Sequence, residues 1–534
     1  MSTYKVCILS AGKGIRMGEL TQNINKSLLP IQEKAIISHI IDKFDDSIEI
    51  VVAVGHEGEK VEEYLSHAHP HRSIKIVNVK HCEGPGSGPG RSLLECEPEL
   101  QCPFIIFAGD TLVQERIPSP DRNWLGVSFL DEDEDISRFC SAEIKEGKIS
   151  SLTDKKQCNN NHVFIGLAAV NSYRQFWDAL KENDSLVNNE LQISNGLLKL
   201  INFDLYPERF TWLDTGTRES YFAAREKMEG NQDTFNFDKI NEFTYLFGGR
   251  LIKYFGDSEK VSSRCKRAES LKGLCPPIEK QTTSFFSYKL LKGETVYECL
   301  TPEIASNFFA WCKDYLWSRK TLDSKEASAF KSSCKKFYKE KTYSRVEAYR
   351  KKYPNDPEKN DVINDTDVPS LSTLLEKVDW DKLTDGIPVG YHGDLQFDNV
   401  LKTGWKSDGK EDFKLIDWRQ DFGGLVTHGD LYYDLAKMYG GMTLPYNLIK
   451  KNKFNLRKDP EGKIYYDIQS SYKILESQDR FREFVEKEGY DFNKIKLIRA
   501  IIFLNMSPLH EPPFDKLLHY ASRYHLNLAL KDED

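Results

Sequence analysis

The sequence predicts two successive domains, an α/β domain with a doubly wound parallel sheet and then an α+β domain. The chain has 534 residues and a mass of 61.6 kDa, which is more than one ordinary hydrophobic core accommodates. Short β-branched runs alternate with amphipathic stretches as far as about Ala224, and helical patterns dominate from about Pro302 onward. We therefore place the two domains at residues 1–228 and 241–534.

In the first domain, the expected strands are short apolar runs rich in Val and Ile, and the expected helices are the amphipathic stretches between them. Helices between successive strands favour a parallel sheet, because a parallel pair needs a crossover connection. Residues 225–240 lose the apolar pattern and are interpreted as a connector. Strands are expected at residues 5–9, 48–54, 74–79 and 104–107, and helices at 36–44, 61–65 and 90–96.

The second domain begins with strand patterns. Residues 244–255 and 283–291 are interpreted as paired strands, and a helical body follows them, interrupted by a polar stretch at residues 353–370. A small sheet followed by helices is the pattern of an α+β domain.

Composition and charge favour a globular protein of the cytoplasm. The formal net charge is -8 at pH 7 and is spread over many acids and bases, so we expect no binding of nucleic acid or of a membrane. No apolar run approaches the roughly 18–20 residues that span a bilayer, and Val6–Leu9 is too short for the core of a signal peptide. The sequence leaves open whether the chain forms a homo-oligomer.

A glycine-containing loop follows the first expected strand. Backbone N–H groups of Ala11, Gly12 and Gly14 can approach a phosphate chain closely, while Arg16 and Lys26 can neutralise its charge. The loop matches neither the dinucleotide-binding G-x-G-x-x-G pattern nor a P-loop. By itself it is a weak signal for nucleotide binding.

Two aspartates strengthen that signal. Asp110 ends the apolar run 104–108, and Asp214 lies at a second boundary between an apolar run and a turn. Ligands of open α/β sheets gather outside the carboxyl ends of the strands. Because hard carboxylate oxygens suit Mg²⁺, we expect Asp110 and Asp214 to bind this metal beside the phosphates.

Together these segments resemble the sugar-phosphate nucleotidyltransferases, the family that includes glucose-1-phosphate thymidylyltransferase and related uridylyl- and cytidylyltransferases. The resemblance covers about residues 4–225 and implies a Rossmann-like fold. It rests on A-G-x-G-x-R at Ala11–Arg16, K-x-L-L-P at Lys26–Pro30, G-D-T at Gly109–Thr111 and W-L-D-T-G-T at Trp212–Thr217.

The resemblance implies that a phosphate oxygen of the substrate attacks the α-phosphorus of a nucleoside triphosphate and expels pyrophosphate. Arg16 would bind the leaving pyrophosphate and Lys26 the triphosphate. No left-handed β-helix repeat follows, which argues against a two-domain N-acetylglucosamine uridylyltransferase. Weaker matches assign Gly86 and Gly88 to the nucleobase, Lys155 to the substrate phosphate and Glu190 to sugar hydroxyls.

A second motif lies far downstream. The segment His392–Asn399 reads H-G-D-x-x-x-x-N, and an apolar strand ending in Asp417 follows it. A phosphotransferase needs a carboxylate near the accepting hydroxyl and oxygen ligands that hold metal on the β- and γ-phosphates. Asp394 fits the first role, and Asn399 and Asp417 fit the second as ligands of Mg²⁺.

This region resembles the aminoglycoside phosphotransferase and choline kinase superfamily, which shares the protein-kinase fold. The resemblance spans about residues 240–534 and includes the G-D-x-x-x-D-L-A pattern from Gly429. It implies that Asp394 orients or deprotonates the hydroxyl, that Lys253 reaches the phosphates of ATP, and that Glu269 pairs with Lys253. The phosphate-covering loop is represented only by Gly248-Gly249.

These patterns lead to the hypothesis of a bifunctional enzyme that uses ATP, a second NTP (CTP, UTP or dTTP) and a small-molecule substrate. The kinase would make a phosphomonoester that the transferase consumes. A sugar phosphorylated at its anomeric oxygen is the first candidate substrate, and choline or ethanolamine is the alternative, for which Trp311, Trp317 and Trp418 could form an aromatic cage. A third interpretation makes one half a nucleotide-binding regulatory module.

Overall fold

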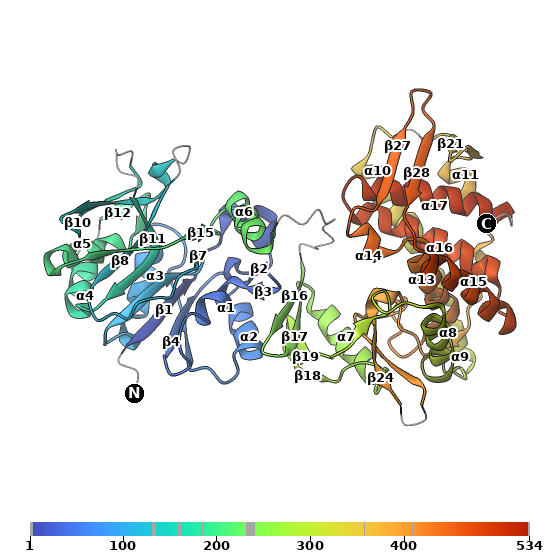
Figure 1. Ribbon diagram of the computed structural model, residues 1–534, viewed down its shortest axis with the longest axis horizontal. Coiled ribbons are helices and arrows are strands. Elements are labelled where there is room, and N and C mark those ends of the chain that lie inside the picture. The colour runs from blue at the N-terminus through green and yellow to red at the C-terminus, as the bar shows by residue number, and fades with distance from the viewer. Residues whose placement is uncertain are drawn as a thin grey trace. The chain divides into compact units, whose positions relative to one another are not determined.

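The structure is a computed structural model that describes residues 4–130, 135–156, 162–182, 185–230, 241–356, 358–406 and 409–531 (Figure 1). The chain divides into two compact units. Of the described residues, unit 1 contains 4–230, 241–258 and 282–287, and unit 2 contains 259–281 and 288–531.

The strands of unit 1 include β1, β4, β5 and β6, which correspond to the four apolar runs expected to be strands. The strands are β1 (Lys5–Ser10), β2 (Pro30–Ile31), β3 (Lys34–Ala35), β4 (Ile50–Val54), β5 (Ile74–Asn78), β6 (Phe104–Ala108), β7 (Thr111–Val113), β8 (Trp124–Phe129), β9 (Cys140–Lys145), β10 (Lys148–Asp154), β11 (His162–Val170), β12 (Leu186–Val187), β13 (Glu190–Leu191), β14 (Tyr206–Arg209) and β15 (Trp212–Asp214).

A nine-stranded mixed sheet forms the centre of unit 1. Seven strands follow the order β10-β9-β11-β6-β1-β4-β5, and β8 pairs with β11 and β14. Strands β6, β1, β4 and β5 are parallel, whereas β11 is antiparallel to β6. The predicted parallel sheet is thus confirmed for these four strands and wrong for the β9–β11 side. There the two-residue turn Glu146-Gly147, with positive φ at both residues, joins β9 to β10 without a crossover helix.

Helices cover both faces of this sheet, as predicted. Val6 and Ile8 of β1 belong to one buried cluster and Cys7 to another, because side chains alternate between the two faces of a strand. The first cluster includes α1 and α2, and the second includes α4 and α5. The helices are α1 (Ile36–Ile41), α2 (Gly58–Ala68), α3 (Pro89–Glu95), α4 (Tyr173–Glu182), α5 (Ser194–Leu200) and α6 (Arg218–Glu229).

Strands that follow the predicted connector pack into the core of unit 1. They are β16 (Glu242–Phe247), β17 (Arg250–Phe255) and the start of β19 (Phe285–Lys289). Tyr245 is fully buried, its hydroxyl donates to the carbonyl of Leu28 at 2.7 Å, and its ring lies 4.9 Å from that of Tyr64. By packing, these strands therefore belong with the first half of the chain.

The predicted connector is wrong at its beginning, because α6 continues to Glu229. A capping box between Thr217 and Ser220 fixes the first turn of α6, and Tyr221 and Ala224 bury its inner face. Residues 231–240 of the predicted connector lie outside the described residues. The assignment of separate activities to residues 1–228 and 241–534 stays a prediction.

Unit 2 is mainly helical, as the sequence predicts. The polar stretch 353–370 contains a hairpin of two short strands, β21 and β22, whose β21 pairs with β28 in a four-stranded sheet. Its strands are β18 (Ile278–Gln281), β20 (Glu294–Thr295), β21 (Asp361–Ile363), β22 (Thr366–Val368), β23 (Pro388–Val389), β24 (Val400–Trp405), β25 (Glu411–Leu415), β26 (Gly429–Asp430), β27 (Phe454–Lys458) and β28 (Ile464–Ile468). Its helices are α7 (Ser258–Ser270), α8 (Pro302–Trp311), α9 (Ser324–Lys335), α10 (Lys341–Lys352), α11 (Leu371–Glu376), α12 (Trp380–Thr384), α13 (Leu431–Thr443), α14 (Tyr446–Ile449), α15 (Tyr472–Lys487), α16 (Phe492–Met506) and α17 (Phe514–Lys531).

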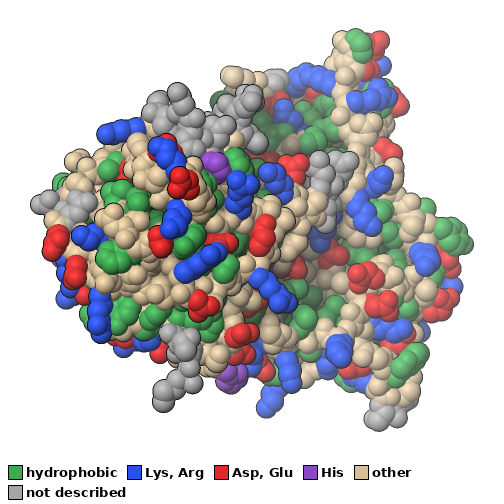
Figure 2. Space-filling view, turned by 60° about the vertical axis from the view of Figure 1, so that its left-hand side comes forward, with side chains coloured by type: hydrophobic (Ala, Val, Ile, Leu, Met, Phe, Trp, Pro, Cys, Tyr) green, Lys and Arg blue, Asp and Glu red, His purple; other side chains and the backbone are tan. Residues whose placement is uncertain are grey.

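The surface carries both signs of charge. On the face drawn in Figure 2, Lys and Arg side chains are interspersed with Asp and Glu side chains. Within the described part of the chain, no helix combines the length and the apolar character needed to cross a membrane.

Candidate active sites

The glycine-containing loop leaves the sheet at the end of β1, between the parallel neighbours β4 and β6. Asn25 anchors this loop, because its side-chain amide donates to the carbonyls of Ser10 and His56, both at 2.8 Å. Gly14 has φ 64°, and a β-carbon there would lie 3.3 Å from Oγ1 of Thr21. A residue with a side chain would be strained at position 14. The sequence analysis did not identify Asn25, since an asparagine in a turn carries no specific signal.

The loop opens into a cavity of about 710 Å³. A cavity of this size accommodates a nucleotide together with a small second substrate. Nine of the predicted residues line it: Ala11, Gly12, Gly14, Arg16, Lys26, Gly88, Asp110, Lys155 and Glu190. Gly86 and Asp214 do not line the cavity. Gly216 of the Trp212–Thr217 motif also lines it, as do residues outside the motifs, among them Arg138, Phe164, Gln192 and Ser194.

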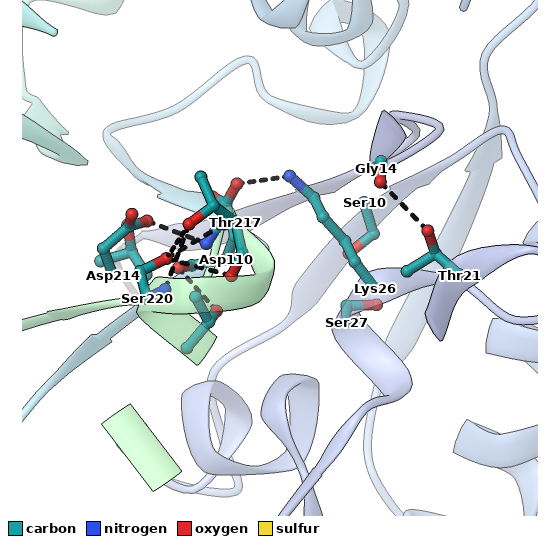
Figure 3. Close-up of polar contacts among 12 residues, drawn as sticks. Ser10, Gly14, Thr21, Lys26, Ser27, Asp110, Asp214, Thr217 and Ser220 are labelled. Atoms are coloured by element: carbon teal, nitrogen blue, oxygen red, sulfur yellow. Dashed lines mark hydrogen bonds and ion pairs between the residues drawn. The ribbon is translucent and has the colours of Figure 1, made fainter. Parts of the chain in front are cut away.

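Lys26 and Asp110 both line this cavity and form an ion pair (Figure 3). Thr215 holds the strand end of Asp110 in place, because its backbone N–H and its hydroxyl both donate to the Asp110 carbonyl, at 2.9 and 2.8 Å. Burial raises the pKa of Asp110, but the charge and hydrogen bond of Lys26 outweigh burial and bring the pKa below its ordinary value. Asp110 is therefore ionised at neutral pH.

Asp214 converges on the same point from β15, which pairs with β7 so that Asp214 lies opposite Thr111. A β-carbon built on Gly216 would lie 3.0 Å from Oδ1 of Asp214, 3.1 Å from Oδ2 of Asp110 and 3.5 Å from a guanidinium nitrogen of Arg16. The absent side chain of Gly216 thus leaves a small space that two carboxylates and one guanidinium border.

This space fits a hard cation. Burial and the negative charge of Asp110 raise the pKa of Asp214, because both effects disfavour its ionised form. In the described residues, no group of three or more His, Cys, Asp or Glu side chains could hold a metal. Mg²⁺ commonly binds one or two carboxylates and completes its octahedron with substrate phosphates and water. Asp110 and Asp214 meet that requirement.

The opposite wall of the cavity is built by the loop 84–90 lying against β13. The N–H of Leu191 donates to the carbonyl of Ser87 at 2.7 Å. Gly88 has φ 109°, and a β-carbon there would lie 2.8 Å from the Leu191 carbonyl oxygen, so only glycine permits this approach. The Lys155 ammonium lies 3.3 Å from Oε2 of Glu190. Lys155 and Glu190 are thereby brought together, and their roles in binding the substrate stay predictions.

The second motif lies in unit 2, where its residues are held by buried hydrogen bonds. Asp434 is fully buried, and its carboxylate accepts from the N–H groups of His392 at 2.8 Å and Gly393 at 2.7 Å. The Asn399 amide donates to the backbone carbonyl of Asp394 at 2.9 Å. These contacts fix the loop that carries Asp394 and Asn399.

Asp417 lies two residues after β25 and has φ 56°, in the left-handed region that non-glycine residues seldom occupy. A strained backbone at a site residue requires support from the surroundings. His392 supplies part of it, because its ring nitrogen Nε2 is 2.9 Å from the carbonyl oxygen of Ile416. A guanidinium nitrogen of Arg264 on α7 lies 4.0 Å from Oδ1 of Asp417. The structure thus brings Asp394, Asn399 and Asp417 into one loop system.

Lys437 is a residue of this site that the sequence analysis missed. Its ammonium lies 2.8 Å from Oδ1 of Asp394. Burial raises the pKa of Asp394, but Lys437 overcomes this effect and lowers the pKa to about 2. Asp394 is a weak base at that pKa and is suited to accepting a hydrogen bond from a hydroxyl. The sequence signal that could have identified Lys437 is its position three residues after Asp434, which places both side chains on one face of α13. Asp434 holds the loop of Asp394, so a residue on the same face lies near that loop.

The other residues predicted for the kinase are spread over both units. Lys253 lies on β17 in unit 1 and Glu269 on α7 in unit 2, so that their pairing stays a prediction. Arg267, one turn before the end of α7, is fully buried and donates to the carbonyls of Tyr391 and Val426. It attaches α7 to the loop of Asp394. The three tryptophans considered for an aromatic cage, Trp311, Trp317 and Trp418, are all buried.

The N-terminal part of the chain, which contains the first motifs, is similar to known proteins. Residues 6–116 match the family described as "MobA-like NTP transferase domain". Bifunctional protein GlmU of Methanococcus maripaludis is 27% identical over 202 residues, which are 36% of this chain and 46% of that protein. A probable glucose-1-phosphate cytidylyltransferase of Bacillus subtilis is 33% identical over 117 residues, 21% of this chain and 42% of that protein.

A structure of UDP-glucose pyrophosphorylase with UDP-glucose aligns with a TM-score of 0.37 and 20% identity, over 42% of this chain and 98% of the other. The chain spans less than half of the length of the GlmU and cytidylyltransferase relatives above. The N-terminal part of the chain is an NTP transferase domain that resembles sugar-phosphate nucleotidyltransferases.

Proposed function

We propose that the chain is a bifunctional enzyme in which the N-terminal domain transfers a nucleotidyl group from an NTP to a sugar phosphate. The C-terminal domain, in this proposal, phosphorylates the free sugar with ATP at its anomeric oxygen. The product is an NDP-activated precursor for surface polysaccharide or glycoconjugate synthesis. The observation that carries the first activity is the convergence of Asp110, Asp214 and Arg16 on the space at Gly216.

In the transfer step, an oxygen of the sugar phosphate forms a bond to the α-phosphorus, and the bond to the bridging oxygen breaks so that pyrophosphate leaves. Backbone N–H groups of the loop 11–14 and the side chains of Lys26 and Arg16 neutralise the triphosphate from one wall of the cavity. Asp110 and Asp214 would hold Mg²⁺, which withdraws charge from the reacting phosphates when bound. Lys155 orients the attacking phosphate, and Glu190 binds sugar hydroxyls.

In the kinase step, the hydroxyl oxygen forms a bond to the γ-phosphorus of ATP while ADP leaves. Asp394 accepts a hydrogen bond from the hydroxyl and aligns it for in-line attack. Asn399 and Asp417 would hold Mg²⁺ on the β- and γ-phosphates. Support comes from the fixed loop geometry around Asp434 and from the strained backbone of Asp417, which is the kind of feature that functional sites retain.

Two assays test the proposal with the full chain. Mass spectrometry of reactions with ATP, each NTP, free sugars and sugar phosphates would detect both products. We expect Asp110→Asn to abolish formation of the nucleotide sugar and pyrophosphate, and Asp394→Asn to abolish formation of the sugar phosphate. If wild type forms neither product with any member of a broad panel, the proposal is wrong.

A further inference from the structure

Four cationic side chains of unit 2 form a group that we call the basic cluster: Lys341, Arg345, Arg419 and Lys437. Lys437 and Arg419 of this cluster act on Asp394, whose pKa they lower. Lys341 and Arg419 lie over the ring of the same residue, Phe337, at 4.3 and 4.9 Å from its centroid. The backbone of Arg419 is fixed to the loop of Asp394, because its N–H donates to the carbonyl of His392 at 3.0 Å. Lys437 contacts Asp394 itself, at 2.8 Å.

The basic cluster has too little negative charge around it. Among the residues that the structure describes, Lys437 has its partner in Asp394, but no carboxylate lies within 4.0 Å of Lys341, Arg345 or Arg419. The Nε of Arg419 is buried and has no hydrogen-bond partner. Burial and the charges of Arg419, Lys437 and Arg345 lower the pKa of Lys341 well below its ordinary value, and the opposing charge of Asp421 offsets this only in part.

Such an arrangement is unfavourable without an anion, because half-buried like charges repel and lose hydration. Proteins tolerate it where a negatively charged ligand completes the site. We propose that the compound phosphorylated at Asp394 carries its own carboxylate or phosphate group, which the basic cluster binds. This inference rests on the proposed kinase function and deepens it by naming the class of acceptor.

In the reaction, the acceptor hydroxyl oxygen bonds to the γ-phosphorus, the bond from that phosphorus to the bridging oxygen breaks, ADP leaves, and the hydroxyl proton passes to solvent. The second anionic group stays unchanged in the basic cluster. A choline or ethanolamine acceptor would bring a further cation against Lys341 and Arg345. The ring of Phe337, moreover, is already covered by Lys341 and Arg419 and is not free for a quaternary ammonium group.

The test compares acceptors that share one sugar ring and differ in charge: glucose, glucosamine, glucuronate and glucose 6-phosphate. Choline is added as a cationic acceptor, and glycerol and glycerate are added as a second pair of one neutral and one anionic acceptor. ADP release by the full chain is measured for wild type, Arg345→Gln and Lys341→Met. Arg350→Gln is the matched control, because Arg350 lies on the same helix, α10, and is paired in solvent with Glu347 at 2.9 Å.

We expect an anionic member of a pair to have the higher kcat/KM, and Arg345→Gln to raise its KM about tenfold or more, as expected for loss of a charge-assisted contact, with kcat nearly unchanged. Arg350→Gln should behave as wild type. Equal or better use of the neutral or cationic member would overturn the inference. So would a rise in the KM for ATP alone, since the basic cluster would then bind the nucleotide.

If no acceptor yields ADP, calorimetric binding of glucuronate and glucose 6-phosphate separates the two proposals. Binding to wild type that Arg345→Gln or Lys341→Met weakens, and that Arg350→Gln preserves, would support the anion site while the kinase function fails. Absence of binding to wild type would overturn the inference independently of any kinase activity.

Discussion

The substitution Gly216→Ala tests the proposed metal site between Asp110 and Asp214 without changing its charge. The added β-carbon would lie 3.0 Å from a carboxylate oxygen of Asp214 and 3.1 Å from one of Asp110, whereas ordinary contacts begin at 3.4 Å. The carboxylates would have to move by a few tenths of an ångström. Because Mg²⁺ requires oxygens at about 2.1 Å in near-ideal octahedral geometry, a methyl group in this space should exclude the ion.

We expect nucleotidyl transfer to fall ~100-fold or more, which corresponds to ~2.7 kcal/mol of lost transition-state stabilisation. Gly216 is not among the residues with positive φ, so an alanine fits its backbone and the free energy of unfolding should change by less than ~1 kcal/mol. Pyrophosphate release measures the first quantity and denaturant unfolding the second.

The matched control is Gly440→Ala on α13, where the new β-carbon would meet Phe503 and Arg499 at ordinary distances of 3.5 and 3.6 Å. It should leave pyrophosphate release unchanged. Wild-type activity of Gly216→Ala at the same magnesium dependence would show that no ion sits between Asp110 and Asp214, and the metal assignment would have to be withdrawn.

Three further predictions concern the two sites and the helical unit. Asp214→Asn should abolish pyrophosphate release and leave ATP-dependent phosphorylation intact, because the carboxylate is lost only from the first site; normal release would refute its role. Asp394→Asn should stop phosphorylation while the transferase still acts on a pre-formed sugar phosphate, and parallel loss of both activities would show that the halves are coupled. Burial lowers the pKa of His519 to about 3, from the usual ~6.5 of the unfolded chain, so the unfolded state takes up the proton first and stability falls as the pH drops from ~6.5 toward 3. His519→Phe should remove about 3 kcal/mol of that loss of unfolding free energy between pH 7 and pH 4. Urea titrations of the variant and of wild type at both pH values measure the free energy of unfolding, and the same pH dependence in both proteins would contradict the prediction.

The sequence predicted the centre of the first fold well, because β1, β4, β5 and β6 are short Val- and Ile-rich runs flanked by helices. It failed for β9–β11, because neither the mixed polar pattern of β9 and β10 nor the apolar run of β11 reveals whether a strand pairs parallel or antiparallel. It also assigned the residues of β16 and β17 to the second domain, although they pack into the core of unit 1. The position of an aromatic residue in the chain does not show which core its side chain enters.

Site residues were predicted where they belong to a continuous motif. Lys26 and Asp110 come from separate motifs, and the structure pairs them. Arg138 lies in the connection between β8 and β9, and Phe164 lies on β11. Both line the cavity, but neither belongs to a sequence motif that could have identified it. The same holds for the basic cluster, whose members come from three separate segments, namely α10, the loop after β25 and α13, and act on one another only in the folded chain.

The burial of Tyr245 among the residues of the first unit limits where the chain can be cut without exposing its core. A fragment that ends within residues 231–240 would lack Tyr245, whose ring packs on Tyr64 and whose hydroxyl donates to the carbonyl of Leu28. The shortened product would expose an aromatic surface that favours aggregation. A fragment that keeps the whole core of unit 1 must therefore include β16 and β17.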